Sequence, residues 1–266
     1  MKIDAFTRKS HYWNEDRFII GKNYFLVIDG ATPLIKIKHK NLACYMVNYI
    51  KKNIHKYDGP IKARLEALSS DIYKKLNTNS LDTAYLPSAS LCYVEEENDE
   101  FIVGIVGDCE VVIKTRNNEI IRCFDDSLSK LDTAALTEMV KIAKEKEIDV
   151  CSARPLINDI LIKNRRLQNK SNGYNAYTVL PDFSLNELKY KFKKDDVKEI
   201  YLYSDGFSDS FNHLGIYSSC EEMFKKSLDI KEEVNKIKNE AYLDSKCNLH
   251  PRFKVIDDIT IIKYVK

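Results

Sequence analysis

Short apolar runs separated by turn residues open the chain and indicate β-strands. The first runs cover residues 3–7, 17–20 and 24–28, and Gly21-Lys22-Asn23 separates the last two. Turn residues between apolar runs of this length are typical of a β-hairpin. Further runs predict strands over residues 90–94, 101–106, 111–115, 120–124, 177–180, 199–203 and 259–265.

A different periodicity predicts helices between these groups of strands. Over residues 42–54 and 61–76, the apolar side chains recur at the spacing that places them on one helical face. Helical patterns also cover residues 128–147, 155–169, 220–228 and 232–242. Strands and helices therefore occur in blocks, which favours an α+β fold of antiparallel sheets covered by helices over a parallel sheet.

Charge and composition exclude several classes of protein. The 266 residues contain 42 Lys and Arg against 40 Asp and Glu, whereas nucleic-acid-binding proteins usually carry a strong basic excess. No apolar run is long enough to span a membrane, and the first residues lack an apolar signal segment. The seven scattered Cys favour reduced thiols. We therefore expect a cytoplasmic monomer with a single domain over residues 1–266.

The most informative pattern is the placement of carboxylates at the ends of predicted strands. They are Glu15-Asp16 before the strand over 17–20, Asp29-Gly30 after 24–28, Gly107-Asp108 after 101–106, Ser204-Asp205-Gly206 after 199–203, and Asp257-Asp258 before 259–265. Each one alone is compatible with an ordinary turn, because Asp and Gly are both turn formers. Together they can bring several carboxylates to one sheet edge.

Such a group of carboxylates predicts a metal site. Converging carboxylates repel one another and stay ionised only where cations compensate them. Oxygen ligands without paired His or Cys select hard ions such as Mg²⁺ or Mn²⁺, and a neighbouring Gly lets the backbone come close to the ion. Two ions bridged by one carboxylate can activate water and stabilise an in-line phosphoryl transfer.

In their order and strand context, these residues resemble the metal-dependent protein phosphatase family, the protein phosphatase 2C-like enzymes. The most specific part is Leu202-Tyr203-Ser204-Asp205-Gly206 followed by Asp257-Asp258-Ile259-Thr260-Ile261. Arg165-Arg166-Leu167-Gln168-Asn169 followed by Gly173-Tyr174 is similar to the bacterial branch. The resemblance covers nearly the whole chain. It implies a four-layer α-β-β-α sandwich, in which helices flank two antiparallel sheets and a dinuclear metal site lies at one edge.

The resemblance also implies roles for individual residues. Asp29 would bridge two Mn²⁺ or Mg²⁺ ions, and the Gly30 carbonyl would bind one of them. Asp205 and Asp257 would complete the protein ligands of the first ion, whereas Glu15 and Asp16 would serve the second ion directly or through water. Asp108, together with Asp205, matches the place of a weaker third ion. The implied reaction is hydrolysis of a phosphoserine or phosphothreonine protein by direct attack of a metal-activated water. Asp29, Asp205 and Asp257 would form the catalytic set.

The sequence departs from the family pattern near the expected substrate. Ala31-Thr32-Pro33 replaces a Gly-Gly tail, Ser88-Ala89-Ser90 replaces Gly-Ser-Thr, Asp258 replaces Asn, and His11 stands at the position of the phosphate-binding Arg. We therefore expect either His11 or Arg8 to bind the substrate phosphate. The departures also leave open a second function, that of a catalytically weak or silent phosphatase-like module for binding or regulation.

Other residues have simpler interpretations. A covalent phosphatase of the haloacid dehalogenase type is disfavoured, because Val27 occupies the position of its nucleophilic Asp. Arg154, Arg165 and Arg166 are expected to lie on a helix and to face solvent. The remaining histidines are expected to be ordinary surface or packing residues, and they are His39, His55, His213 and His250.

Overall fold

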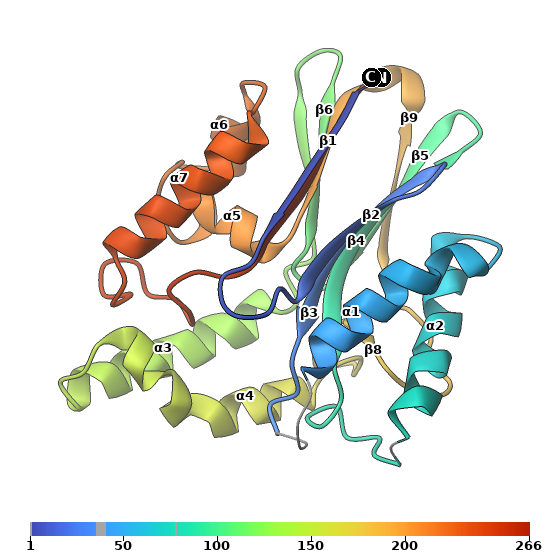
Figure 1. The fold of residues 1–266 in the computed structure, drawn as a ribbon. Helices are drawn as coiled ribbons and strands as arrows, with labels where there is room; N and C mark the ends of the chain where they lie inside the picture. Colours follow the sequence, from blue (N-terminus) through green and yellow to red (C-terminus); the bar gives the residue numbers. More distant parts are fainter. Residues whose placement is uncertain (1, 36–40, 78) are drawn as a thin grey trace.

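The computed structural model describes residues 2–35, 41–77 and 79–266, which form two antiparallel sheets (Figure 1). The five-stranded sheet has the order β1 (Lys2–Arg8), β11 (Ile259–Val265), β10 (Val197–Tyr203), β6 (Glu110–Thr115) and β7 (Ile120–Cys123). The other sheet has the order β2 (Asp16–Ile20), β3 (Tyr24–Ala31), β4 (Ser88–Glu97), β5 (Glu100–Val106) and β9 (Leu188–Lys193), and β8 (Tyr177–Thr178) also pairs with β4.

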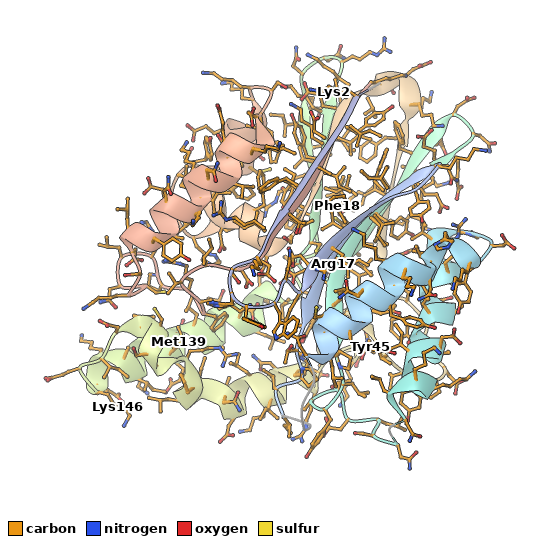
Figure 2. All side chains as sticks on the ribbon, viewed as in Figure 1. Lys2, Arg17, Phe18, Tyr45, Met139 and Lys146 are labelled. Carbon is orange, nitrogen blue, oxygen red and sulfur yellow. The ribbon has the colours of Figure 1, made fainter. Side chains whose placement is uncertain are left out.

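The two sheets pack against each other through apolar side chains (Figure 2). Successive side chains of a strand point to opposite faces, so β3 contributes to two cores. Phe25 and Val27 join the core between the sheets, whereas Leu26 and Ile28 join the core on the other face. Because β3 is buried on both faces, it reads in the sequence as one continuous apolar run rather than an alternating one.

Helices cover the outer face of each sheet. α1 (Leu42–Asn53) and α2 (Ile61–Leu76) cover the sheet that contains β3, and the short 3₁₀ helix η1 (Ile54–Lys56) joins them. α5 (Asp205–Asn212), α6 (Cys220–Phe224) and α7 (Ile230–Leu243) cover the sheet that contains β10. The predicted α+β sandwich of four layers is confirmed. Among the described residues, no helix is both long and apolar enough to cross a membrane.

A further helical unit lies beyond one end of the sheets, and Figure 1 shows it in yellow-green below them. It consists of α3 (Ser129–Glu145), the 3₁₀ helix η2 (Val150–Ile157) and α4 (Asn158–Arg165). The unit has an apolar cluster of its own around Met139, which Figure 2 labels. Phe253 and Val255, from the segment before β11, pack against this cluster.

One local prediction was wrong, and two elements were not predicted. The expected helix over 155–169 is divided, because Pro155 lies in the 3₁₀ helix η2 and α4 ends at Arg165. The edge strand β9 was missed, since its exposed lysines hide the alternation with the partly buried Tyr190 and Phe192. The helix α5 was also missed, because the Asp-Gly pair at its start is typical of a turn. A third 3₁₀ helix, η3 (Lys194–Asp196), connects β9 to β10.

Candidate metal centre

The strand ends bring five aspartates together at one edge of the sandwich. Asp16 and Asp29 are cross-strand partners on β2 and β3. Asp108 lies in the turn between β5 and β6, Asp205 begins α5 directly after β10, and Asp257 precedes β11. The carboxylate of Asp29 interacts electrostatically with the other four. The convergence expected from the strand-end pattern is therefore present in the structure.

This concentration of charge shifts the ionisation of the group. Burial raises the pKa of Asp29 well above its usual value, and the charges of Asp16 and Asp205 raise it further. Burial also raises the pKa of Asp16 to about 7, against the hydrogen bond from Ser204. The pKa of Asp205 rises well above its usual value through burial and the charge of Asp257. A bound cation would relieve both causes, because it replaces lost solvation and offsets the repulsion.

Buried oxygen atoms without partners show that the site fits a cation. Asp16 is 0% exposed, and its Oδ2 accepts a hydrogen bond from Ser204 Oγ at 2.7 Å. Within the described residues, its Oδ1 has no partner, and neither has the buried Oδ1 of Asp205. Buried carboxylate oxygens are costly unless a donor or a cation pairs with them. The donor set of oxygens suits Mn²⁺ or Mg²⁺.

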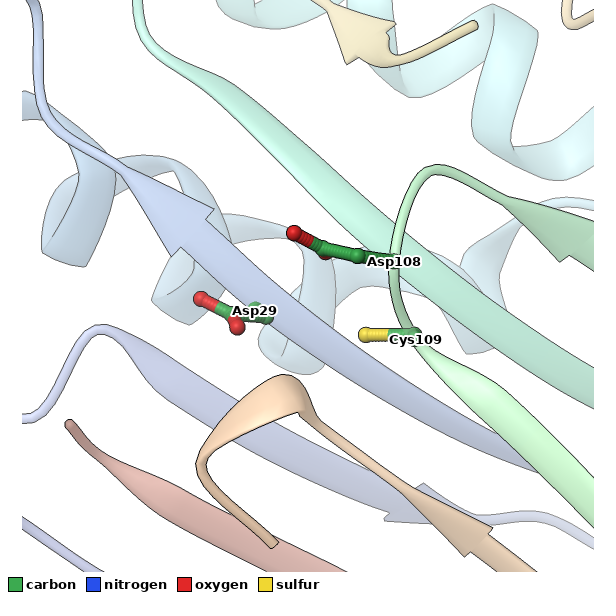
Figure 3. Close-up of side chains that lie close together, drawn as sticks. All are labelled: Asp29, Asp108 and Cys109. Carbon is green, nitrogen blue, oxygen red and sulfur yellow. The ribbon is translucent and has the colours of Figure 1, made fainter. Parts of the chain in front are cut away.

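A thiol that sequence reasoning did not assign to the site lies beside these carboxylates (Figure 3). Cys109 Sγ and carboxylate oxygens of Asp29 and Asp108 all lie within 4.8 Å of one another. Burial raises the pKa of Cys109 well above its usual value, so the thiol is protonated. The signal in the sequence was its place directly after Gly107-Asp108, which was interpreted only as a packed cysteine.

Gly30 is required by close backbone packing. Its amide donates to the carbonyl oxygen of Glu15 at 3.1 Å. A Cβ at this position would lie 2.8 Å from that oxygen and 3.0 Å from Val47 on α1. A side chain would thus push the loop that carries Glu15 away from β3. The role of the Gly30 carbonyl as an ion ligand stays a prediction.

Glu15 is turned toward the start of α1. Its Oε1 accepts hydrogen bonds from Thr32 Oγ1 at 2.6 Å and from Asn41 Nδ2 at 2.5 Å. Asn41 also caps α1 through a bond from the Cys44 amide. The unusual Ala31-Thr32-Pro33 segment thus supplies a hydroxyl that orients this carboxylate.

Asp258 fixes the loop between β1 and β2. Its Oδ1 accepts hydrogen bonds from the amide and the hydroxyl of Ser10 at 2.6 and 2.8 Å. Its Oδ2 accepts from the amide of Glu15 at 2.6 Å. The carboxylate is buried and binds both ends of the loop that carries His11. Asp258 therefore positions this loop beside the aspartates.

We expect Asp258→Asn to destabilise the protein. An Asn side chain keeps one acceptor but turns an N–H group toward a backbone amide, so at least one buried donor loses its partner. The expected loss in the free energy of unfolding is roughly 1–3 kcal/mol, measured by chemical denaturation. Asp182→Asn, on an exposed turn, is the matched control. Equal stability of both variants would contradict the stabilising role of the hydrogen bonds that Asp258 accepts from Ser10 and Glu15.

The two expected phosphate ligands lie in different surroundings. His11 is exposed in the loop that Asp258 fixes. Arg8 Nη1 donates to Asn235 Oδ1 at 2.8 Å, so its guanidinium lies against α7. The structure does not bring Arg8 into the aspartate group, and the role of either residue stays a prediction.

Other cations lie closer to the carboxylates. Lys254 Nζ pairs with Asp257 Oδ1 at 2.8 Å and Oδ2 at 2.6 Å. Although burial opposes it, the charges of Asp257 and Asp205 raise the pKa of Lys254. Arg165 was predicted to face solvent, and this prediction was wrong. Its Nη1 donates to Ser88 Oγ at 3.0 Å, because the end of α4 packs toward β4.

A cavity of about 450 Å³ opens beside Asp108, Asp205 and Asp257. Residues of α3, of α5 and of the segment 252–257 form its walls. Burial raises the pKa of Asp132, on the α3 wall, to about 7, and the charge of Asp108 contributes. His213 also lines this cavity, where its Nδ1 lies 2.7 Å from Asp209 Oδ1. Another histidine of the sequence prediction, His39, lies outside the described residues.

Comparisons with known proteins bear on the fold. No family model matches the sequence, and no curated protein matches it either. The structure, however, matches solved structures of bacterial phosphatases over the whole chain. The serine/threonine phosphatase Stp1 from Staphylococcus aureus matches with a TM-score of 0.56 and 13% identity, over 100% of this chain and 94% of that chain. The fold is that of bacterial serine/threonine phosphatases.

Two structures of the phosphatase PstP agree with this result. The enzyme from Mycobacterium tuberculosis has a TM-score of 0.54 and 16% identity, over 98% of this chain and 97% of that chain. A catalytic domain of PstP in complex with two manganese ions has a TM-score of 0.51 and 12% identity, over 98% and 96% of the two chains. The predicted resemblance to the protein phosphatase 2C-like fold is confirmed.

Proposed function

We propose that this protein is a metal-dependent phosphatase that hydrolyses phosphoserine or phosphothreonine in proteins. The observation that carries the proposal is the group of converging aspartates with buried, unpartnered oxygens at Asp16 and Asp205. The shared fold with bacterial serine/threonine phosphatases, one of them in complex with two manganese ions, supports the same function.

The mutual interactions of the aspartates support the metal-binding roles that we assign to them. Asp29, which interacts electrostatically with the four others, would serve two ions, one held together with Asp205 and Asp257 and the other together with Asp16. Glu15 would serve the second ion through water, since its Oε1 is bound to Thr32 and Asn41. When bound, Mn²⁺ or Mg²⁺ supplies positive charge that lowers the pKa of water and stabilises the transferring phosphoryl group.

Neighbouring side chains of this protein orient the aspartate carboxylates. Ser204 Oγ donates to Asp16 and also accepts the Thr260 amide at 3.0 Å, so one hydroxyl links β2, β10 and β11. Lys254 holds both oxygens of Asp257 and would have to release at least one of them when a metal binds. Its ammonium group would then be free to face an anionic substrate.

Hydrolysis assays test the proposal directly. We expect the purified protein to hydrolyse p-nitrophenyl phosphate and a phosphothreonine peptide with Mn²⁺, and to lose this activity with a chelator. Calorimetry should show at least two bound ions. Metal binding without hydrolysis of either compound would contradict an active phosphatase and favour the silent binding module, for which the exposed His11 at the arginine position is the supporting observation.

Asp108 provides a test of the weaker third ion. We expect Asp108→Ala to retain two tightly bound ions and to lose turnover on the order of tenfold or more, because Asp108 lines the cavity in which a substrate would lie. Calorimetry gives the stoichiometry and steady-state kinetics the turnover. An unchanged rate at saturating Mn²⁺ would show that Gly107-Asp108 is only a turn.

His11 provides a test of phosphate capture. An imidazole loses its charge around a pKa of about 6.5, whereas a guanidinium stays charged and forms a bidentate contact. We expect His11→Arg to lower KM for a phosphopeptide roughly tenfold and to flatten its pH dependence, and His11→Ala to raise KM. Arg8→Ala is the matched variant. If it alone raises KM, Arg8 and not His11 binds the phosphate.

A further inference from the structure

Two cysteines from distant parts of the chain meet beside the helical unit. Cys151 lies in η2 and Cys247 in the loop after α7, 96 positions apart in sequence. Their Sγ atoms lie 2.8 Å apart, and both residues are free thiols. Neither belongs to the aspartate group, and no sequence motif connects them.

The loop that carries Cys247 is held firmly in place. The Asp244 carboxylate accepts the amides of Asn248, Leu249 and His250, at distances from 2.9 to 3.2 Å. It also pairs with the guanidinium of Arg252 at 2.8 Å, and both of these side chains are buried. Cys247 itself is 0% exposed and has a positive φ of 56°, which the surrounding loop imposes.

The segment that carries Cys151 is fixed to the same loop by the backbone. The Cys151 amide donates to the Lys246 carbonyl at 3.3 Å, and the Val150 amide donates to Asn248 Oδ1 at 3.1 Å. These two hydrogen bonds join residues at or next to Cys151 to the residues on either side of Cys247. The contact between the thiols therefore results from the fold and not from a chance rotamer.

We propose that Cys151 and Cys247 form an oxidation site, at which hydrogen peroxide converts the two thiols into a reversible disulfide. Cys151 is partly exposed and meets the oxidant, whereas the other cysteines, Cys247 included, are buried. Burial also raises the pKa of Cys247 to about 12, which disfavours it as the nucleophile of the first step.

The chemistry balances in two steps. The peroxide O–O bond breaks as one oxygen is transferred to the Cys151 sulfur, giving a sulfenic acid and releasing one water. The Cys247 sulfur then bonds to the Cys151 sulfur, the S–O bond breaks, and the hydroxyl leaves as a second water with the Cys247 proton. The two thiols are oxidised by two electrons, and the peroxide is reduced to water.

The disulfide would connect the walls of the cavity described above. Cys151 belongs to the helical unit whose α3 forms one wall, and Cys247 leads to the segment 252–257, which forms another. Cys247 already packs in the apolar cluster of that unit with Met139 and Ala153. A covalent bond would hold these walls together in the oxidised protein.

Mass spectrometry and thermal unfolding test this site on the full chain. The protein is reduced, freed of reductant, treated with hydrogen peroxide, alkylated and digested without reduction. We expect a cross-linked peptide that contains Cys151 and Cys247, and an intact mass lower by two hydrogen atoms. We also expect the midpoint of thermal unfolding to rise by roughly 5–10 °C and to return with dithiothreitol.

Matched variants separate this site from general oxidation. Cys151→Ser should abolish both the cross-link and the thermal shift, whereas Cys44→Ser, at a buried thiol on α1, should keep both. Oxygen atoms added to Cys151 without a cross-link would overturn the proposal, and so would a disulfide between any other pair. None of these readouts depends on phosphatase activity.

Discussion

Asp29→Asn is expected to abolish metal binding and activity together. The substitution keeps the size of the side chain but removes the charge that interacts with all four neighbouring aspartates. Loss of even an outer partner of a metal ligand typically costs 10–100-fold in affinity, so we expect affinity for Mn²⁺ to fall by more than about 100-fold. Turnover should fall by about a thousandfold or more, which corresponds to roughly 4 kcal/mol of transition-state stabilisation.

The same variant should be more stable than the wild type when no metal is present. Burial and the charges of Asp16 and Asp205 disfavour the ionised form of Asp29, and an uncharged amide avoids that cost. In EDTA we expect the midpoint of thermal unfolding to rise by roughly 2–6 °C. Asp182→Asn, on an exposed turn, is the control and should change neither property. Unchanged metal stoichiometry in Asp29→Asn would contradict the assignment of the bridging ligand.

Strand ends were the part of the site that sequence could predict. An apolar run shows where a strand ends, and in an antiparallel sandwich the ends of several strands lie at the same edge. Asp29, Asp108 and Asp205 were found in this way, because each directly follows such a run or its turn. The assignment needed no knowledge of side-chain conformation, since backbone position alone brings these residues near one another.

Contacts that depend on side-chain direction could not be predicted. The carboxylate of Glu15 lies next to Asp16 in sequence but turns to Thr32 and Asn41, because α1 begins there. Arg165 was expected on a solvent-facing helix, yet α4 ends at it and directs it to Ser88. Both outcomes are set by the packing of distant segments, on which local periodicity carries no information.

Pairs formed across long sequence separations were missed for the same reason. Cys151 and Cys247 carry no spacing motif, and only the packing of the helical unit on the loop after α7 brings them together. Lys254 lies near Asp257 in sequence, but its bond to both carboxylate oxygens depends on the path of the segment before β11. Such residues become visible only when the fold is known.

Without metal, the protein is expected to lose stability as the pH rises from 5.5 to 8, the reverse of the trend for carboxylates in ion pairs. The pKa of Asp16 is raised from 3.8 to about 7, so the folded state holds a proton that the unfolded state has already released. A group that binds more protons when folded makes unfolding easier as the pH increases. The loss of stability extends from the pKa of Asp16 in the unfolded state up to its pKa in the folded state. Asp29 and Asp205, whose pKa values are also raised, extend this loss to higher pH.

Below about pH 4 a second group should act in the opposite direction. Although burial opposes it, the Arg252 guanidinium lowers the pKa of Asp244, and this pair loses its contribution as acid protonates the carboxylate. Stability in EDTA should therefore pass through a maximum near pH 4, close to the ordinary pKa of an aspartate, and then fall toward pH 8, by on the order of 3 kcal/mol between pH 5.5 and 8. Urea denaturation at fixed ionic strength measures this change.

Mn²⁺ should reverse the slope above pH 6, because ionised carboxylates bind the metal and binding to the folded state adds to stability. Asp16→Asn should flatten the fall in EDTA, since its amide oxygen can still accept from Ser204 Oγ while no proton is held. The matched control is Asp182→Asn, which should keep the wild-type slope. A steady rise of stability in EDTA from pH 5.5 to 8 would contradict this prediction. It would mean that the aspartates ionise in the metal-free fold at no cost in stability, so that they are neither buried nor mutually repelling as the structure indicates.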